Sequence, residues 1–266
     1  MSEPAQIEVL HASKRFVTPT GDVLAMSDIN LQVQRGEFVC LLGPSGCGKS
    51  TLLNALAGFS LPSAGSVRVD GREVTAPGPD RGMVFQEYAL FPWMTVEQNI
   101  AFGLQIQGLS REAIDAKVSA LLATLRLSDF RQRFPRDLSG GMKQRVAIAR
   151  VLAIDSPTLL MDEPFGALDA LTRRSLQDEL LRLWAELRKT VVFVTHSIEE
   201  ALYLADRVVV MTYRPGTIKR DIAVHLPRPR DASSTAFNEL KRQIAELVME
   251  EQLRHEDAER TALTTD

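Results

Sequence analysis

The sequence has little cysteine, no excess of one charge and no long apolar run. Two cysteines among 266 residues exclude a disulfide framework and favour a reducing compartment. A net charge of −3 gives the chain no overall basic character of the kind that binds nucleic acid. No apolar run approaches the roughly 18 residues of a membrane span. The N-terminus, which begins Met1-Ser2-Glu3-Pro4, lacks the basic region and following apolar stretch of a signal peptide. We therefore expect a globular protein that reaches any membrane through a partner.

What is present is the composition of an ordinary soluble domain, with 45% hydrophobic and 24% charged residues. The length allows one large domain or two small ones with ample core. Neither an internal repeat nor a low-complexity tract interrupts the sequence, so its information lies in local motifs.

The most informative motif is the run Gly43-Pro44-Ser45-Gly46-Cys47-Gly48-Lys49-Ser50-Thr51, which fits the phosphate-binding pattern G-x-x-x-x-G-K-[ST]. An apolar run at 38–42 predicts a buried strand before it, and 51–58 predicts a helix closed by glycine. Glycines let backbone N–H groups surround phosphates, and the helix N-terminus adds its dipole. We expect Lys49 to reach the β- and γ-phosphates and Ser50 to ligate Mg²⁺. This P-loop predicts nucleotide binding and nothing narrower.

Strand patterns before and after the P-loop predict an α/β fold. Half-buried strands with alternating polarity are expected at 7–10, 29–33 and 66–70. Buried strands are expected at 82–85, 158–161, 190–195 and 208–211. Helices separate the last three of these, which is the alternation that produces a parallel sheet.

Helical spacing is found in three further segments. Apolar positions recur at helical intervals over 95–127, and Ser139 starts a second helix that extends to about 153. A charged helix is expected over about 233–256, with the final ten residues frayed. The block of about 87–135 is either a helical subdomain inserted in the core or a set of helices that cover the sheet, and spacing does not decide between them.

Two further elements carry chemistry. Asp162 and Glu163 follow a predicted parallel strand, where Asp162 can hold Mg²⁺ and Glu163 can act as general base on water. The segment Leu138–Arg145 places Ser139 as an N-cap before Gly140 and Gly141, which leaves backbone N–H groups exposed at a helix start. That segment is either an ordinary capped helix or a second anion site, which would face the nucleotide of another copy of the chain.

Together these motifs resemble the ATP-binding subunit of an ABC transporter, from about Ile7 to Leu247. The most specific element is the Leu138–Arg145 signature, which lies between the P-loop and Asp162-Glu163 in the family's order. The resemblance implies an α/β fold: a P-loop NTPase core (ABC ATPase) with an N-terminal antiparallel β-subdomain and an inserted α-helical subdomain at about 87–155. The ATP-binding domain would cover 1–247, followed by a charged tail over 248–266.

The resemblance also assigns roles to single residues. Gln86 matches the Q-loop glutamine that touches Mg²⁺ or the attacking water, and His196 matches the switch histidine that contacts the γ-phosphate. Asp169 matches the D-loop, which reaches across the dimer, and Phe16 matches the aromatic residue that stacks on adenine. The implied catalytic set is Glu163, His196, Gln86 and Lys49. The implied metal ligands are Ser50, Gln86 and Asp162. The implied nucleotide contacts are Phe16, Gly43, Pro44, Ser45, Gly46, Cys47, Gly48, Lys49, Ser50, Thr51, Ser139, Gly140, Gly141 and Asp169.

One position departs from the family pattern. Met142 stands where glutamine is commonest in the signature, while the serine and both glycines are kept. We expect function to survive with a weaker contact to the sugar of the nucleotide.

The resemblance implies that ATP and Mg²⁺ bind between the P-loop of one copy and Ser139–Gly141 of a second copy in a twofold homodimer. A single cassette without a membrane span resembles an importer ATPase, a peripheral subunit on the cytoplasmic face of the inner membrane. Its implied partners are transmembrane permease subunits and, indirectly, a solute-binding protein. The stretch Ala89–Met94 is either part of the groove that receives a permease helix or core of the helical subdomain.

The segments Pro79–Val96 and Leu226–Asp231 resemble the nitrate/sulfonate/taurine importer group, which implies a small anionic solute. Two alternatives stay open: an importer ATPase for another solute such as a thiamine precursor, and a soluble ABC ATPase without a transport role. A P-loop kinase or nucleotide sensor would need neither the signature nor His196.

Overall fold

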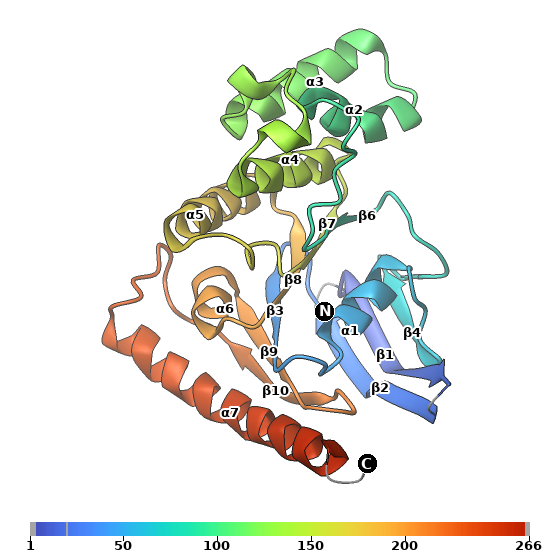
Figure 1. Cartoon of the computed structure of the whole chain (residues 1–266), viewed down its shortest axis with the longest axis vertical. Helices are drawn as coiled ribbons and strands as arrows, with labels where there is room; N and C mark the ends of the chain where they lie inside the picture. The colour runs from blue at the N-terminus through green and yellow to red at the C-terminus, as the bar shows by residue number, and fades with distance from the viewer. Residues whose placement is uncertain (1–3, 20, 264–266) are drawn as a thin grey trace. The chain divides into compact units, whose positions relative to one another are not determined.

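A computed structural model describes residues 4–19 and 21–263 (Figure 1). Met1–Glu3 and Thr264–Asp266, which belong to the predicted ATP-binding domain and the predicted tail, lie outside the described residues. The chain divides into two compact units. The first contains the chain up to Gly78 and from Thr190 onward, and the second is Pro79–Lys189.

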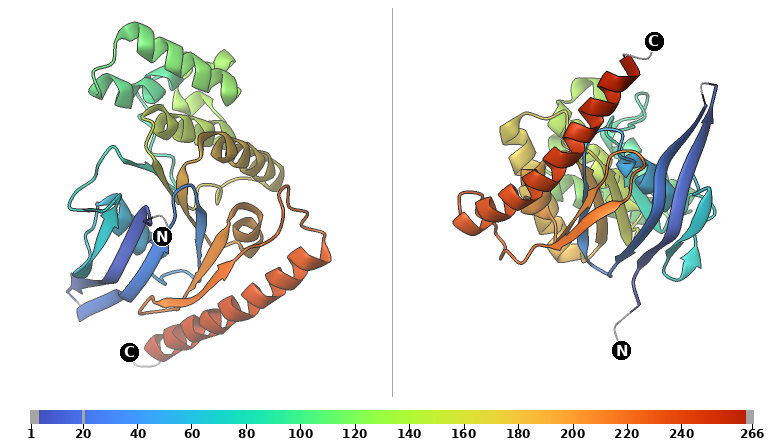
Figure 2. Two further views of the ribbon diagram at one scale, coloured as in Figure 1. Left: turned by 180° about the vertical axis from the view of Figure 1, so that it is seen from behind. Right: turned by 90° about the horizontal axis from the view of Figure 1, so that it is seen from below.

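An antiparallel sheet forms the N-terminal part of the first unit, as the sequence predicted (Figure 2). Its strands follow the order β2-β1-β4-β5. They are β1 (Ile7–Thr18), β2 (Gly21–Val33), β4 (Ala64–Val69) and β5 (Arg72–Glu73). β1 and β2 are longer than the alternation at 7–10 and 29–33 predicted, because their backbones stay paired as far as Thr18 and Gly21 although the side chains there are largely solvated.

The parallel strands of the first unit carry its core. β3 (Phe38–Leu42) lies between β8 (Thr190–Thr195) and β9 (Arg207–Met211) and pairs with both in parallel. Every residue of β3 and β8 is buried, which explains their uninterrupted apolar runs. Helices α1 (Lys49–Ala57) and α6 (Ile198–Leu204) pack against these strands.

Two C-terminal elements differ from the sequence-based expectation. β10 (Ile218–Ala223) pairs antiparallel with β9 and was not predicted, because its exposed edge carries charged residues instead of an apolar pattern. Helix α7 (Thr235–Leu263) lies along α6 and β9 (Figures 1 and 2) and continues past residue 256, where we expected it to end. Its last turns gain partners from tertiary contacts, such as the ring of Tyr213 at 4.6 Å from that of His255.

The second unit combines a strand pair with a group of helices. β6 (Arg81–Val84) and β7 (Thr158–Asp162) pair in parallel. The helices are α2 (Val96–Ile106), α3 (Arg111–Thr124), α4 (Gly140–Ala153) and α5 (Ala170–Leu187), with short 3-10 turns at Ser128–Phe130 and Pro135–Asp137. The helical pattern over 95–127 is thus two helices, and Ser110 caps the second. The predicted subdomain at about 87–155 falls within this unit, and its boundaries stay a prediction.

A buried amide organises the turn before α2. Asn99 is fully buried, and its Oδ1 accepts a hydrogen bond of 2.9 Å from the N–H of Phe91. Its Nδ2 donates to the carbonyls of Phe91, Met94 and Thr95 at 3.0–3.2 Å. One side chain therefore closes the loop of residues 91–95 onto the helix that follows.

We expect Asn99→Ala to lower the free energy of unfolding by about 2–4 kcal/mol, since buried backbone groups lose their partner. Urea denaturation of the purified protein measures this loss. The matched control is Gln105→Ala on the exposed side of the same helix, which should stay within about 0.5 kcal/mol of wild type. Equal unfolding midpoints for the two variants would contradict this role of Asn99.

Candidate functional site

The P-loop lies between β3 and α1, in the predicted strand–loop–helix order. Gly48 is the N-cap of α1 and has a left-handed φ of 91°, so no side chain caps the helix start. The first turn of α1 carries no acidic residue, and neither does that of α4. By contrast, the first turns of α2, α3 and α6 each carry glutamate, and α5, whose first turn is also free of acidic residues, has the carboxylate of Asp169 as its N-cap. The two helix starts that the sequence assigned to phosphates are therefore free of a side chain that would repel an anion.

Lys49 is held inside the P-loop. Its side chain is only 5% exposed, and Nζ donates to the carbonyls of Gly43 and Pro44, each at 2.8 Å. These two carbonyl groups hold the ammonium group of Lys49 beside the start of α1. Phosphate oxygens form stronger, charge-assisted hydrogen bonds with an ammonium group than carbonyls do, so this charge is available for a polyphosphate ligand.

His196 leaves the parallel strands at the same edge as the P-loop. The last register pair of β3 and β8 is Leu42 with Thr195, so Gly43 and His196 are the next residues of neighbouring strands. The turn after His196 is held by Thr195 Oγ1, which accepts from the N–H of Ser197 at 3.0 Å and donates to buried Glu200 at 2.5 Å. The side chain of His196 is exposed at this edge.

Phe16 lies in β1, in register with Val23 of β2, and is 40% exposed. Lys14 Nζ lies 5.3 Å from the centre of its ring. An exposed ring on the antiparallel sheet is compatible with the predicted stacking on adenine, which stays a prediction.

In the second unit, the predicted base and two of the three predicted metal ligands lie at the C-terminal ends of β6 and β7. Asp162 is the last residue of β7, Glu163 follows it, and Gln86 lies two residues beyond the end of β6. Val84 pairs with Met161 at the end of the parallel ladder, so the three side chains leave the pair at the same end. The backbone of Glu163 has a φ of 42°, a left-handed conformation that costs energy for a residue with a side chain. Such strain is typical of a position held for function.

The signature segment and the D-loop meet at the N-termini of α4 and α5. Ser139 caps α4, with Oγ accepting from the N–H of Met142 at 3.3 Å, and Asp169 caps α5 by accepting from the N–H of Thr172 at 3.0 Å. A Cβ at Gly141 would lie 2.5 Å from the methyl group of Thr172. Only glycine therefore lets the start of α4 approach the start of α5 so closely.

Arg150 is a site-supporting residue that sequence reasoning missed. From α4 it donates to the carbonyls of Ala89 and Tyr88 at 2.6 and 3.3 Å, and its guanidinium lies 5.5 Å from the centre of the Phe91 ring. It thereby fixes the segment directly after Gln86. An arginine inside a helical pattern carries no signal for this role, because its partners lie about sixty residues earlier in the chain.

The stretch Ala89–Met94, for which two readings were open, lies at the surface. None of its residues is buried, and Trp93 is 70% exposed. The rings of Phe91 and Trp93 lie 5.7 Å apart, and Phe91 also contacts Phe102 of α2 at 4.7 Å. The stretch is therefore not buried core of the subdomain: Leu90, Phe91 and Met94 are half-buried, and the rest presents an exposed aromatic surface centred on Trp93.

Comparison with known proteins agrees with these features. A family model described as ABC transporter matches residues 26–166. A nitrate import ATP-binding protein of Synechocystis is 47% identical over 89% of this chain and 89% of its own length. An aliphatic sulfonates import ATP-binding protein of Bacillus cereus is 44% identical over 90% of this chain and 94% of its own length. An ABC transporter ATP-binding protein of Methanocaldococcus jannaschii is 48% identical over 94% of this chain and 93% of its own length.

Solved structures give the same likeness. A dimeric ATP-binding cassette in a post-hydrolysis state with ADP and Pi superposes with a TM-score of 0.74 and 32% identity, over 82% of this chain and 99% of that chain. A component of an ABC transporter complex from Clostridium perfringens gives a TM-score of 0.76 and 27% identity, over 91% of this chain and 95% of that chain. Within the residues that the structure describes, no helix combines the length and apolar character needed to cross a bilayer.

The environment of the two cysteines leads to a chemical prediction. Burial raises the pKa of Cys47 and, more strongly, that of Cys40, although Lys49 acts in the opposite direction at Cys47. A raised pKa shifts thiolate formation to higher pH, so at about pH 8 neither thiol should react with iodoacetamide in the folded protein. Mass spectrometry after alkylation measures this, and both cysteines should react in concentrated urea as the control. Rapid labelling of native Cys47 at that pH would contradict its protonated, buried state.

Proposed function

Because the chain belongs to the ABC transporter family of ATP-binding proteins, we propose that it is the ATP-hydrolysing subunit of an importer for a small anionic solute. The chain is an ABC-type ATPase. The observation that carries the proposal is the pair of helix starts at α1 and α4, both without acidic residues in the first turn. The anionic solute is supported only by likeness to nitrate and sulfonate import proteins, because an ATPase subunit does not itself contact the solute.

The proposed nucleotide is ATP with Mg²⁺. Lys49 and the N–H groups at the start of α1 bind the phosphates, and Phe16 stacks on the base. The side chains of Ser50, Gln86 and Asp162 supply hydroxyl, amide and carboxylate oxygens, the hard donors that suit this cation. When bound by these residues, Mg²⁺ would supply positive charge that neutralises the phosphates of the nucleotide.

Hydrolysis needs a positioned water and stabilisation of negative charge. Glu163 accepts the proton of the attacking water, and Gln86 orients that water. His196 and Lys49 hydrogen-bond the γ-phosphate, where charge is redistributed in the transition state. Glu163 directly follows the end of the strand β7, which anchors its backbone beside the proposed site.

The second half of the site comes from another copy of the chain. Ser139, Gly140 and Gly141 bind the nucleotide held by the partner's P-loop, and Asp169 lies at the same face because α4 and α5 pack at Gly141. ATP therefore holds two copies together and hydrolysis releases them. The exposed aromatic surface of Ala89–Met94 receives a helix from a transmembrane permease subunit, so that opening and closing of the dimer reach the membrane. The protein is thus a peripheral subunit at the cytoplasmic face of the membrane.

Replacing the general base separates binding from chemistry. We expect Glu163→Gln to bind ATP like wild type, to lose about a hundredfold or more of the turnover rate, and to accumulate as an ATP-dependent dimer. Steady-state phosphate release and size-exclusion chromatography with ATP measure these properties. The matched control is Glu186→Gln at the exposed side of α5, which should hydrolyse ATP at the wild-type rate. Undiminished turnover in Glu163→Gln would remove this residue from the role.

Mixing two inactive variants tests the shared site. Lys49→Ala destroys the P-loop half and Ser139→Arg destroys the signature half, so each pure variant should be inactive. In an equal mixture, about half of the dimers contain one copy of each variant. Each mixed dimer has one intact site, formed by the P-loop of the Ser139→Arg copy and the signature of the Lys49→Ala copy. The mixture should therefore hydrolyse ATP at about a quarter of the wild-type rate. A mixture as inactive as its components would contradict a site built from two copies.

A further inference from the structure

The P-loop is braced from outside by the loop between β9 and β10. A Cβ at Gly216 of this loop would lie 2.0 Å from the carbonyl oxygen of Cys47, so only glycine permits the approach. Arg214 Nε donates to the carbonyl of Gly46 at 3.4 Å. The loop of residues 212–217 therefore contacts the P-loop at two successive residues, on carbonyl groups rather than on the N–H groups expected to bind phosphate.

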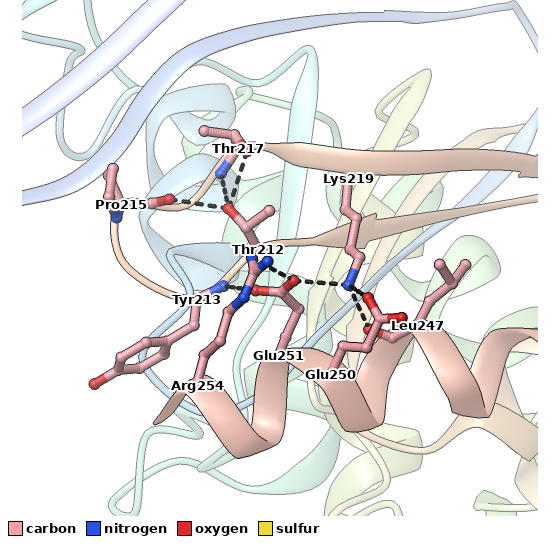
Figure 3. Close-up of polar contacts among 9 residues, drawn as sticks. All are labelled: Thr212, Tyr213, Pro215, Thr217, Lys219, Leu247, Glu250, Glu251 and Arg254. Atoms are coloured by element: carbon pink, nitrogen blue, oxygen red, sulfur yellow. Dashed lines mark hydrogen bonds and ion pairs between the residues drawn. The ribbon is translucent and has the colours of Figure 1, made fainter. Parts of the chain in front are cut away.

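The same loop is stiffened by its own hydrogen bonds. Thr212 Oγ1 accepts from the N–H of Thr217 at 2.8 Å and donates to the carbonyl of Pro215 at 2.9 Å (Figure 3). Gly216 also exchanges hydrogen bonds with β2, donating to the carbonyl of Ala25 at 3.0 Å and accepting from the N–H of Ser27 at 2.9 Å. A displacement at one end of this loop is thus transmitted to its other residues.

The remaining anchor of the loop is a carboxylate from α7. Glu251 is fully buried, and its Oε2 accepts a 2.9 Å hydrogen bond from the N–H of Tyr213, the residue directly before Arg214 (Figure 3). Its Oε1 accepts from Lys219 of β10 at 2.7 Å and from Arg254 at 3.0 Å. Burial raises the pKa of Glu251, but the hydrogen bonds from Lys219 and Tyr213 outweigh that effect and the pKa lies below its ordinary value. The side chain is therefore ionised at neutral pH.

We propose that Glu251 of the C-terminal helix is a positioning residue for nucleotide binding, acting through the 212–217 loop and Arg214 on the P-loop. This inference rests on the proposed ATPase function. Glu251 fixes the backbone of Tyr213. Arg214 and Gly216, which follow Tyr213 in the same hydrogen-bonded loop, contact the carbonyl groups of Gly46 and Cys47. The opposite, N–H side of the P-loop then keeps the spacing that phosphates require.

Three variants test this linkage. Glu251→Ala removes the anchor and Arg214→Ala removes the contact with Gly46 while leaving α7 untouched. The matched control is Glu250→Gln, because Glu250 is the neighbouring carboxylate and also binds Lys219 but has no contact with the loop in the structure. Full-length proteins are compared by ATP titration calorimetry, by KM and kcat of hydrolysis, and by melting temperature without nucleotide.

The expected result is a split between binding and chemistry. The backbone N–H groups of the P-loop bind the phosphates in ground state and transition state alike, so Glu251→Ala and Arg214→Ala should raise Kd and KM for ATP about tenfold and leave kcat within about twofold. Glu250→Gln should bind ATP like wild type.

A lower melting temperature of Glu251→Ala with unchanged Kd and KM would show a purely structural anchor and overturn the proposal. If Glu251→Ala does not fold, Arg214→Ala alone decides: an exposed arginine is removable without loss of the fold, and wild-type affinity in that variant overturns the proposal. A wild-type protein that binds no ATP would instead overturn the proposed function and this inference with it.

Discussion

The parallel pairing of β3 with β8 is the constraint on which the nucleotide half-site depends. All residues of both strands are buried, so a shift of register by one residue would misplace close-packed side chains on both faces of the sheet. With Leu42 opposite Thr195, the P-loop and His196 must leave the strands side by side. The burial of apolar strands thus sets the relative position of the P-loop and His196.

Helix α4 has the same organising role in the second unit. Its first turn contains the signature residues, and Gly141 brings it against the start of α5 that Asp169 caps. Further along the helix, Arg145 donates to Glu179 of α5 at 3.0 Å, and Arg150 holds the carbonyls that follow Gln86. One helix therefore contacts the signature, the start of the D-loop helix and the segment after Gln86.

The C-terminal helix α7 contacts the loop of residues 212–217, which in turn contacts the P-loop. A buried carboxylate is stable only with partners, and Glu251 finds them in Lys219, Arg254 and the backbone of Tyr213. That requirement joins α7 to a loop that touches the P-loop from its carbonyl side. An element that looks like a charged appendage in the sequence is thereby connected to the phosphate-binding region.

The sequence by itself determined the motifs whose geometry is local. The P-loop, the N-cap at Ser139 and the buried strands β3, β7 and β8 follow from residue order alone, because strand burial and helix capping involve neighbours within a few positions. The family likeness, which comparison confirmed, also followed from these motifs.

Only the tertiary structure decided what lies between distant segments. It showed that α7 continues past residue 256, that β10 exists as a polar edge strand, and that no residue of Ala89–Met94 is buried. It also joined Arg150 to the segment after Gln86, and Glu251 to the loop that braces the P-loop. These contacts connect residues about forty or more positions apart, and the physical reason they escape the sequence is that a charged side chain has the same local pattern whether it is solvated or buried against a partner.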